Sequence, residues 1–218
     1  MNGSGKIAAG IIFGDGKKKQ YPMNKVLVLA SHTDDESIGC GATIAKMIEQ
    51  GDEVRVLAFS SCDKEELPDE FYEANYVLGA DCELSNYNFR TLTEDRQHIL
   101  QEMINYREKY NPDIVLTHST HDFHQDHKVV SEESIRAFKH STILGYELPW
   151  NNIESKHQCT VEITQEHLNK KIEAIYVYKS QAHRKCVDPE NIRAWAKMRG
   201  MANGCDYAEV FEVIKLRL

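Results

Sequence analysis

Short, unbroken apolar runs alternate with amphipathic stretches along most of this 218-residue chain. The first run covers residues 26–30 and reads Val-Leu-Val-Leu-Ala. Its length and its lack of alternation are typical of a strand that is buried on both faces. Apolar residues then recur at helical spacing from Ile38 to Ile48, and Gly51 is placed to end that helix. The pattern therefore predicts a buried strand followed directly by a helix.

The same alternation continues to the end of the chain. It predicts further strands at residues 53–60, 81–87, 113–117, 142–148, 160–163 and 207–216, and further helices at residues 69–78, 94–110, 129–139, 165–177 and 190–201. A regular β/α alternation favours a mostly parallel sheet with helices on both faces. We therefore predict an α/β fold, a single Rossmann-like domain of three α/β/α layers over residues 23–218. Residues 1–22 fall outside the pattern, and we interpret them as an N-terminal extension of uncertain role.

Charge and composition narrow the class of partner. The chain has 26 basic and 34 acidic residues, a formal net charge of −8, which disfavours nucleic acid and anionic membrane because both need a basic face. No apolar run approaches the roughly 20 residues that a membrane span requires. The six cysteines are scattered without a Cys-x-x-Cys pair, so we expect reduced thiols in a cytoplasmic protein. A homo-oligomer is compatible with this composition.

The first candidate chemistry lies where the first predicted strand ends. One imidazole, His32, and three carboxylates, Asp34, Asp35 and Glu36, occupy the transition from strand to helix. Ligands of open α/β sheets bind just beyond the carboxyl ends of the strands. The helix dipole alone would explain one or two carboxylates at a helix N-terminus. It does not explain a histidine three residues before a carboxylate at a strand end.

A second cluster follows the fourth predicted strand, where four of the ten histidines fall in one short loop. His118 and His121 are more simply explained as loop or core groups. His124, Asp126 and His127 call for another explanation, because a doubly wound sheet of order 3-2-1-4-5 has its first and fourth strands as neighbours. The two clusters would then meet over one crevice.

Imidazole and carboxylate together are the ligand mixture that zinc accepts. Three protein ligands with an open fourth position mark a catalytic rather than a structural site. The two clusters therefore predict a catalytic metal site at this edge of the sheet. Spacing alone leaves open whether Asp34 or Asp35 is the ligand.

Two short motifs carry a more specific resemblance. They read His-Thr-Asp-Asp-Glu at residues 32–36, followed by Gly-Cys-Gly-Ala-Thr at residues 39–43, and Asp-Phe-His-Gln-Asp-His at residues 122–127. They resemble the paired motifs of the LmbE-like (PIG-L) N-acetylglucosaminyl deacetylase family. Leu78-Gly79 and the Pro-Asp-Ile-Val run at residues 112–115 also fit, and the resemblance covers the chain from about Lys25 onward.

The resemblance implies a zinc-dependent hydrolase that removes an acyl group, usually acetyl, from a sugar amine. Carried over residue by residue, it makes His32, Asp35 and His127 the ligands of one Zn²⁺ per chain. Fe²⁺ would satisfy the same ligand set, because nitrogen and oxygen ligands discriminate weakly between divalent metals. The substrate that it implies is a small N-acetylated amino sugar or a conjugate of one.

The resemblance also implies roles for three further residues. Asp34 would be the general base and later the acid for the departing amine, and His124 would stabilise the oxyanion. Asp126 would orient His124 and keep it charged, whereas Glu36 receives no role. This chemistry is coherent, because amide hydrolysis needs an activated water, a donor for the oxyanion and a proton for the leaving nitrogen.

Substrate recognition departs from the family pattern. An arginine that is usual before the second helix is missing from residues 65–70, which leaves the identity of the sugar open. Arg90, after the third predicted strand, lies on the same predicted rim and is a candidate replacement, although exposed arginines are more often solvated surface groups. Trp150 is a candidate for stacking on a sugar ring, although aromatic residues are more often core. Thr33 and Gln125 stand where proline is common, which affects the backbone more than the chemistry.

Two alternatives remain open at this point. The same zinc and base could serve a metal-dependent amidase or esterase that acts on a non-sugar substrate. The other alternative is a non-catalytic Rossmann-like binding module with a vestigial metal site. Asp34 and His124 argue against the second alternative, because a residue set that merely holds a metal needs neither of them. A two-metal phosphoesterase would need further carboxylate ligands.

Overall fold

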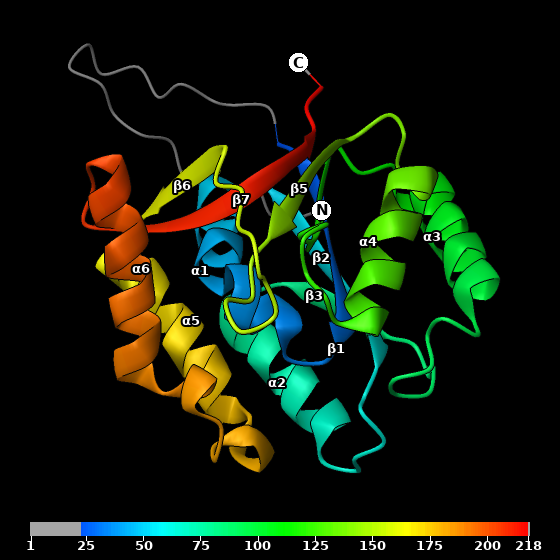
Figure 1. Cartoon of the computed structure of the whole chain (residues 1–218), viewed down its shortest axis with the longest axis horizontal. Coiled ribbons are helices and arrows are strands. Elements are labelled where there is room, and N and C mark those ends of the chain that lie inside the picture. The colour runs from blue at the N-terminus through cyan, green and yellow to red at the C-terminus, as the bar shows by residue number, and fades with distance from the viewer. Residues whose placement is uncertain (1–22, 218) are drawn as a thin grey trace, which may run out of the picture.

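A seven-stranded sheet forms the middle layer of the computed structural model, which describes residues 23–217 (Figure 1). Its strands lie in the order β3-β2-β1-β4-β5-β7-β6. Their bounds are β1 Lys25–His32, β2 Glu53–Ser60, β3 Asp81–Leu84, β4 Ile114–His118, β5 Thr142–Tyr146, β6 Cys159–Ile163 and β7 Tyr207–Lys215. β1 to β5 run parallel, and β7 is antiparallel to both β5 and β6. The predicted order 3-2-1-4-5 is thereby confirmed, and the predicted extension at residues 1–22 lies outside the described residues.

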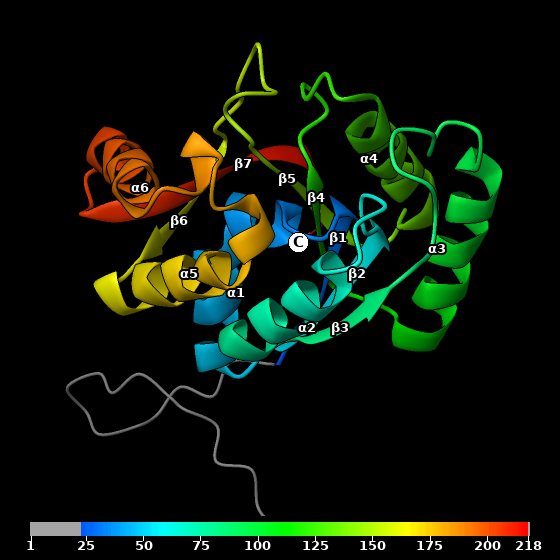
Figure 2. The same ribbon diagram turned by 90° about the horizontal axis from the view of Figure 1, so that it is seen from below.

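Helices cover both faces of the sheet (Figure 2). Their bounds are α1 Asp35–Gln50, α2 Leu67–Leu78, α5 Gln165–Val177 and α6 Pro189–Asn203 on one face, and α3 Arg96–Tyr110 and α4 Gln125–Ala137 on the other. The side chains of β1 account for the layers: Val26, Val28 and Ala30 are buried with the first group of helices, and Leu27 and Leu29 with the second. Because both faces are buried, the strand reads as a continuous apolar run. Within residues 23–217, none of these helices is long and apolar enough to cross a membrane.

Two boundaries next to the site differ from the sequence-based expectation. The third strand ends at Leu84 rather than at residue 87. Helix α4 begins at Gln125 rather than at residue 129, because His124 caps it: the Nδ1 atom of His124 accepts a hydrogen bond from the backbone N–H of Asp126 at 3.2 Å. This early start places Asp126 and His127 in the first turn of the helix.

Helix α1 is interrupted near its start, and a buried ion pair stabilises the interruption. Cys40 has non-helical backbone angles, with φ −143° and ψ 22°. Glu209 of β7 accepts hydrogen bonds from the backbone N–H groups of Ala42 and Thr43 at 3.3 and 2.7 Å, and so caps the second part of the helix. Lys171 of α5 approaches this carboxylate to 2.5 Å, and both side chains are buried. The pair therefore joins α1, α5 and β7.

Loss of the Lys171 charge should destabilise the fold. We expect Lys171→Met, which keeps most of the aliphatic stem, to lower the free energy of unfolding by about 3–5 kcal/mol, because the carboxylate of Glu209 is then buried without a counter-charge. Urea denaturation measures the change. The matched control is Lys170→Met, at the exposed neighbouring position of the same helix. Equal, small losses in the two variants would show that the buried pair does not stabilise the fold.

Candidate active site

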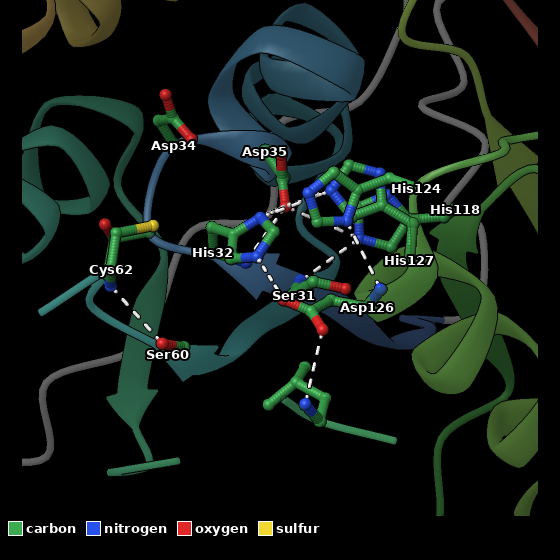
Figure 3. Close-up of polar contacts among 12 residues, drawn as sticks. Ser31, His32, Asp34, Asp35, Ser60, Cys62, His118, His124, Asp126 and His127 are labelled. Atoms are coloured by element: carbon green, nitrogen blue, oxygen red, sulfur yellow. Dashed lines mark hydrogen bonds and ion pairs between the residues drawn. The ribbon is translucent and has the colours of Figure 1, made fainter. Parts of the chain in front are cut away.

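The candidate site lies where β1 and β4 end side by side (Figure 3). His32 is the last residue of β1, Asp35 is the first residue of α1, and His127 comes from the first turn of α4. The exposed fractions of these residues are only 5%, 5% and 2%. His32 and His127 are 95 positions apart in the chain, yet their rings are in contact. The strand order brings the two clusters together, as the sequence predicts.

Three polar atoms of these residues form a small triangle. His32 Nδ1 lies 3.2 Å from Asp35 Oδ2 and 3.2 Å from His127 Nε2, and the last two atoms are 3.4 Å apart. Ligand atoms of a tetrahedral zinc ion with bonds of about 2.0–2.1 Å are separated by about 3.3–3.4 Å. The triangle therefore has the size of one face of such a coordination shell.

His32 and His127 each have one ring nitrogen in the triangle and one outer nitrogen that points away from it. The hydrogen bond of the outer nitrogen decides whether the nitrogen in the triangle carries a lone pair. His32 Nε2 lies 3.0 Å from Asp126 Oδ2, and His127 Nδ1 lies 2.7 Å from Asp122 Oδ2. A carboxylate only accepts, so each ring carries a proton on its outer nitrogen. In neutral rings, two nitrogen lone pairs and a carboxylate oxygen then converge and repel one another unless a proton or a cation lies between them.

A proton can fill this place when no metal is bound. Burial opposes protonation of His32, but the charges of Asp35 and Asp126 outweigh burial and raise its pKa to about 10. Burial would raise the pKa of Asp35, but His127 and His32 hold it well below its usual range. The triangle is therefore a position that strongly favours positive charge.

The structure contradicts the expected partnership between Asp126 and the ring of His124. The Asp126 carboxylate accepts hydrogen bonds from His32 Nε2, from the backbone N–H of Arg90 at 2.8 Å and from the backbone N–H of Leu92 at 3.2 Å. The loop after β3 therefore anchors this carboxylate, and the carboxylate orients His32 instead of His124.

The charge expected for His124 stays a prediction, and the surroundings of its ring bear on it. Because its Nδ1 accepts the capping hydrogen bond of α4, its ring proton is on Nε2. Burial, followed by the charges of His127 and His32, lowers the pKa of His124 to about 4. These surroundings favour the neutral form of the His124 ring, with its Nε2–H group as the donor.

Two residues to which the sequence assigns no catalytic role, His118 and Asp122, contact the ring of His127. His118 is fully buried, stacks on the His127 ring with 3.9 Å between centroids, and lies 3.1 Å from the backbone nitrogen of Ser31. Burial lowers its pKa well below the usual range, so it is a neutral core group, as the sequence indicates. Asp122 is missed as the partner of His127. Its position in the same loop, five residues before His127, is the only signal for that role in the sequence.

Asp34 is buried but lies apart from the triangle (Figure 3). Its carboxylate forms an ion pair with the guanidinium of Arg184. Burial raises the pKa of Asp34 against the opposing effect of this guanidinium. Arg184 belongs to the segment between α5 and α6, which contains two 3₁₀ helices, Lys179–Gln181 and Lys185–Val187. No motif surrounds Arg184, so sequence reasoning misses it.

These groups open into a cavity of about 370 Å³. Five of the predicted metal and catalytic residues line it, namely His32, Asp34, Asp35, His124 and His127. The two candidate substrate residues, Arg90 and Trp150, line the same cavity, together with Cys62, Lys64, Leu67, Phe89, Asn151, Gln181 and Arg184. The predicted site residues are therefore brought to one place, with Asp126 lying behind His32.

A family model described as PIG-L, GlcNAc-PI de-N-acetylase, matches residues 27–138, about half of the chain. The chain belongs to the PIG-L family. The description of this family supports hydrolase activity in the chain, and the matched segment includes both clusters of the candidate site.

Known proteins are similar over most of the chain. The uncharacterized deacetylase YaiS of Escherichia coli (strain K12) is 25% identical over 174 residues, which cover 71% of this chain and 90% of that protein. The structure of N,N'-diacetylchitobiose deacetylase from Pyrococcus horikoshii has a TM-score of 0.72 at 22% identity and covers 88% of this chain and 84% of its own. GalB, the 4-carboxy-2-hydroxymuconate hydratase from Pseudomonas putida KT2440, has a TM-score of 0.74 at 21% identity, covering 90% and 98%. These two structures establish the fold alone.

Proposed function

We propose that this protein is a metal-dependent hydrolase that removes the N-acetyl group from an acetamido sugar or a sugar conjugate. The observation that carries the proposal is the triangle of His32, Asp35 and His127 atoms, with its outer carboxylates, beside a separate buried carboxylate, Asp34. The first group fits a divalent cation, and the second fits a general base. Membership of the PIG-L family supports the acetamido sugar as substrate.

His32 Nδ1, Asp35 Oδ2 and His127 Nε2 would hold the ion, and Asp126 and Asp122 would keep both rings in the required tautomer. Zn²⁺ suits this mixture of imidazole and carboxylate, although Fe²⁺ would suit it as well. When bound, such an ion supplies Lewis acidity toward the carbonyl group and lowers the pKa of a coordinated water toward about 7.

The chain's own residues supply the proton transfers. Asp34 takes a proton from the attacking water and passes one to the amide nitrogen as the C–N bond breaks, so that acetate and a free amine leave. A buried carboxylate with a raised pKa suits both steps, because it binds the proton more readily than an exposed one. Arg184 pairs with one oxygen of this carboxylate, Oδ2. His124, through its neutral Nε2–H group, donates to the oxygen on which negative charge develops.

Loss of a ring should empty the metal site. We expect His127→Ala to retain far less divalent metal than the unmodified protein, and Asp122→Asn to bind it roughly 10- to 100-fold more weakly, because the tautomer of His127 is no longer fixed. Elemental analysis and metal titration measure the two effects. His121→Ala, in the same loop but outside the triangle, is the control. Equal metal content in His127→Ala and the control would remove His127 from the site.

Loss of the base should abolish turnover without emptying the site. We expect Asp34→Asn to keep its metal and to release acetate roughly 10²- to 10⁴-fold more slowly. Acetate release and elemental analysis on the same preparation separate the two effects. Loss of the metal in this variant would show that Asp34, and not Asp35, is the ligand.

His124 should contribute to the rate through its ring donor and to stability through its cap. We expect both His124→Asn and His124→Ala to lose roughly 10²- to 10³-fold in kcat with the metal retained. Asn is a good N-cap, so only His124→Ala should also lose about 1 kcal/mol of stability. Thermal unfolding and kinetics distinguish the two roles. Loss of metal in either variant would make His124 a ligand instead.

The substrate class is tested with metal-loaded protein. We expect acetate release from N-acetylglucosamine or from one of its conjugates, and mass spectrometry detects the free amine. Turnover of a non-sugar amide or ester without release from any acetamido sugar would overturn the deacetylase assignment and favour a different metal-dependent amidase or esterase.

A further inference from the structure

One amide side chain that lines the cavity of the candidate site lacks a partner. Asn151, in the loop between β5 and β6, has an exposed fraction of only 9% and lines this cavity. Within residues 23–217 its hydrogen bonds come from its backbone alone, and its side-chain amide makes none. The amide of Gln181, which lines the same cavity, donates to Ser180 Oγ at 3.1 Å. Because buried polar groups are nearly always hydrogen-bonded, the amide of Asn151 calls for a partner from the cavity.

The backbone of Asn151 is fixed against the loop that follows β4. Its N–H donates to the carbonyl oxygen of Leu148 at 2.8 Å, and its carbonyl oxygen accepts from the N–H of Phe123 at 3.1 Å. The next residue, Asn152, forms an isolated β-bridge with Asp122, and its side-chain oxygen accepts from the N–H of Leu148 at 3.0 Å. The backbone that carries the unpaired amide is therefore held in place without a ligand, which lowers the entropy cost of binding one.

A second set of hydrogen bonds holds the start of this loop on α6. The buried carboxylate of Glu147 accepts from the guanidinium of Arg199 at 2.7 and 2.9 Å and from the indole N–H of Trp195 at 2.8 Å. The loop is thus anchored to the chain after β4 on one side and to α6 on the other. A side chain on a loop that is fixed in this way can select a ligand by its shape.

The residue before Asn151 presents an aromatic surface to the same cavity. Trp150 lines it and is 40% exposed. A pyranose ring has an apolar face of C–H groups and a rim of hydroxyl groups. An indole suits the apolar face, and an amide, with its two donors and its acceptor oxygen, suits two neighbouring hydroxyls. A water molecule would satisfy the amide without accounting for the exposed indole beside it.

We propose that the side chain of Asn151 binds hydroxyl groups of the sugar ring that carries the acetamido group, and so determines which acetamido sugars are accepted. This inference rests on the proposed function and names a specificity-determining residue for it. In a glycoside of a 2-acetamido sugar, the free hydroxyls nearest to the reacting group are those on C3 and C4. An analogue that lacks the bound hydroxyl leaves the amide unpaired in the complex, so the site discriminates against it.

Combined changes in the residue and in the sugar test this contact. The probes are the methyl glycoside of N-acetylglucosamine and its 3-deoxy and 4-deoxy analogues, with metal-loaded protein. We expect at least one deoxy analogue to lose roughly 10- to 100-fold in kcat/KM with the unmodified protein. Asn151→Ala should lose a similar factor with the parent glycoside. In this variant the same deoxy analogue should react as fast as the parent, because the contact is already absent.

Asn152→Ala is the matched control in the same loop. The amide of Asn152 holds the loop backbone and does not line the cavity, so this variant should change kcat/KM for all three probes by one factor. Thermal unfolding shows whether the variants are folded. Asn151→Ala should unfold at the temperature of the unmodified protein, because its side chain has no partner within the described chain. Loss of the preference for the parent glycoside in Asn152→Ala, with the preference kept in Asn151→Ala, would overturn the assignment.

A binding measurement tests the contact without turnover. Calorimetry with methyl glucosaminide, the amine product of the parent glycoside, should give roughly 10- to 100-fold weaker binding to Asn151→Ala than to the unmodified protein. The 3-deoxy or 4-deoxy amine that lacks the bound hydroxyl should bind equally to both proteins. Equal affinity of methyl glucosaminide for the two proteins would contradict the contact.

Failures of the two proposals differ in appearance. Absence of acetate release from every acetamido probe, with binding of methyl glucosaminide that depends on Asn151, overturns the proposed function and leaves the contact in place. Acetate release with deoxy analogues that lose the same factor in Asn151→Ala as in the unmodified protein overturns the contact and leaves the deacetylase intact. A loss in Asn151→Ala that is confined to kcat and equal for all probes also overturns it, because Asn151 would then act on the reacting group.

Discussion

Two carboxylate–imidazole pairs, Asp126 with His32 and Asp122 with His127, are the interactions on which the rest of the site depends. Each pair fixes the proton on the outer side of a ring and turns a lone pair inward. The result, two nitrogen atoms and a carboxylate oxygen within 3.4 Å of one another, is unfavourable without positive charge between them. The fold must therefore hold these groups rigidly, and buried strand ends with a capped helix provide that rigidity.

Much of this framework could be predicted from the sequence because it depends on patterns that repeat. Apolar runs give the buried strands, and helical spacing gives the covering helices. β1 and β4 are adjacent in the usual strand order of such sheets, and this adjacency brings His32 and His127 together. Membership of the family, which the motifs at residues 32–43 and 122–127 indicate, is consistent with the same framework.

The partners of individual polar groups could not be predicted, because they depend on how irregular loops approach one another. Asp126 binds His32 since the backbone of Arg90 and Leu92, in a loop without apolar periodicity, holds its carboxylate in place. Arg184 is 150 positions from Asp34 and lies between short 3₁₀ helices, so neither motif nor periodicity connects the two. The net charge of the chain does not predict the charge around the candidate site for a similar reason. It describes the whole surface, whereas a site responds to charges within about 8 Å at physiological ionic strength.

A deacetylase and a hydratase share this fold, so the chemistry must be decided by particular side chains. Hydrolysis of an amide differs from hydration in requiring a proton for a leaving nitrogen, and a carboxylate outside the triangle of His32, Asp35 and His127 can carry it. Of the two carboxylates that line the cavity within the described chain, only Asp34 is outside the triangle. The partner of Asp34 is Arg184, which comes from an irregular segment between α5 and α6. The surroundings of such a side chain differ from one member of a fold to another, and a comparison of folds alone does not reveal them.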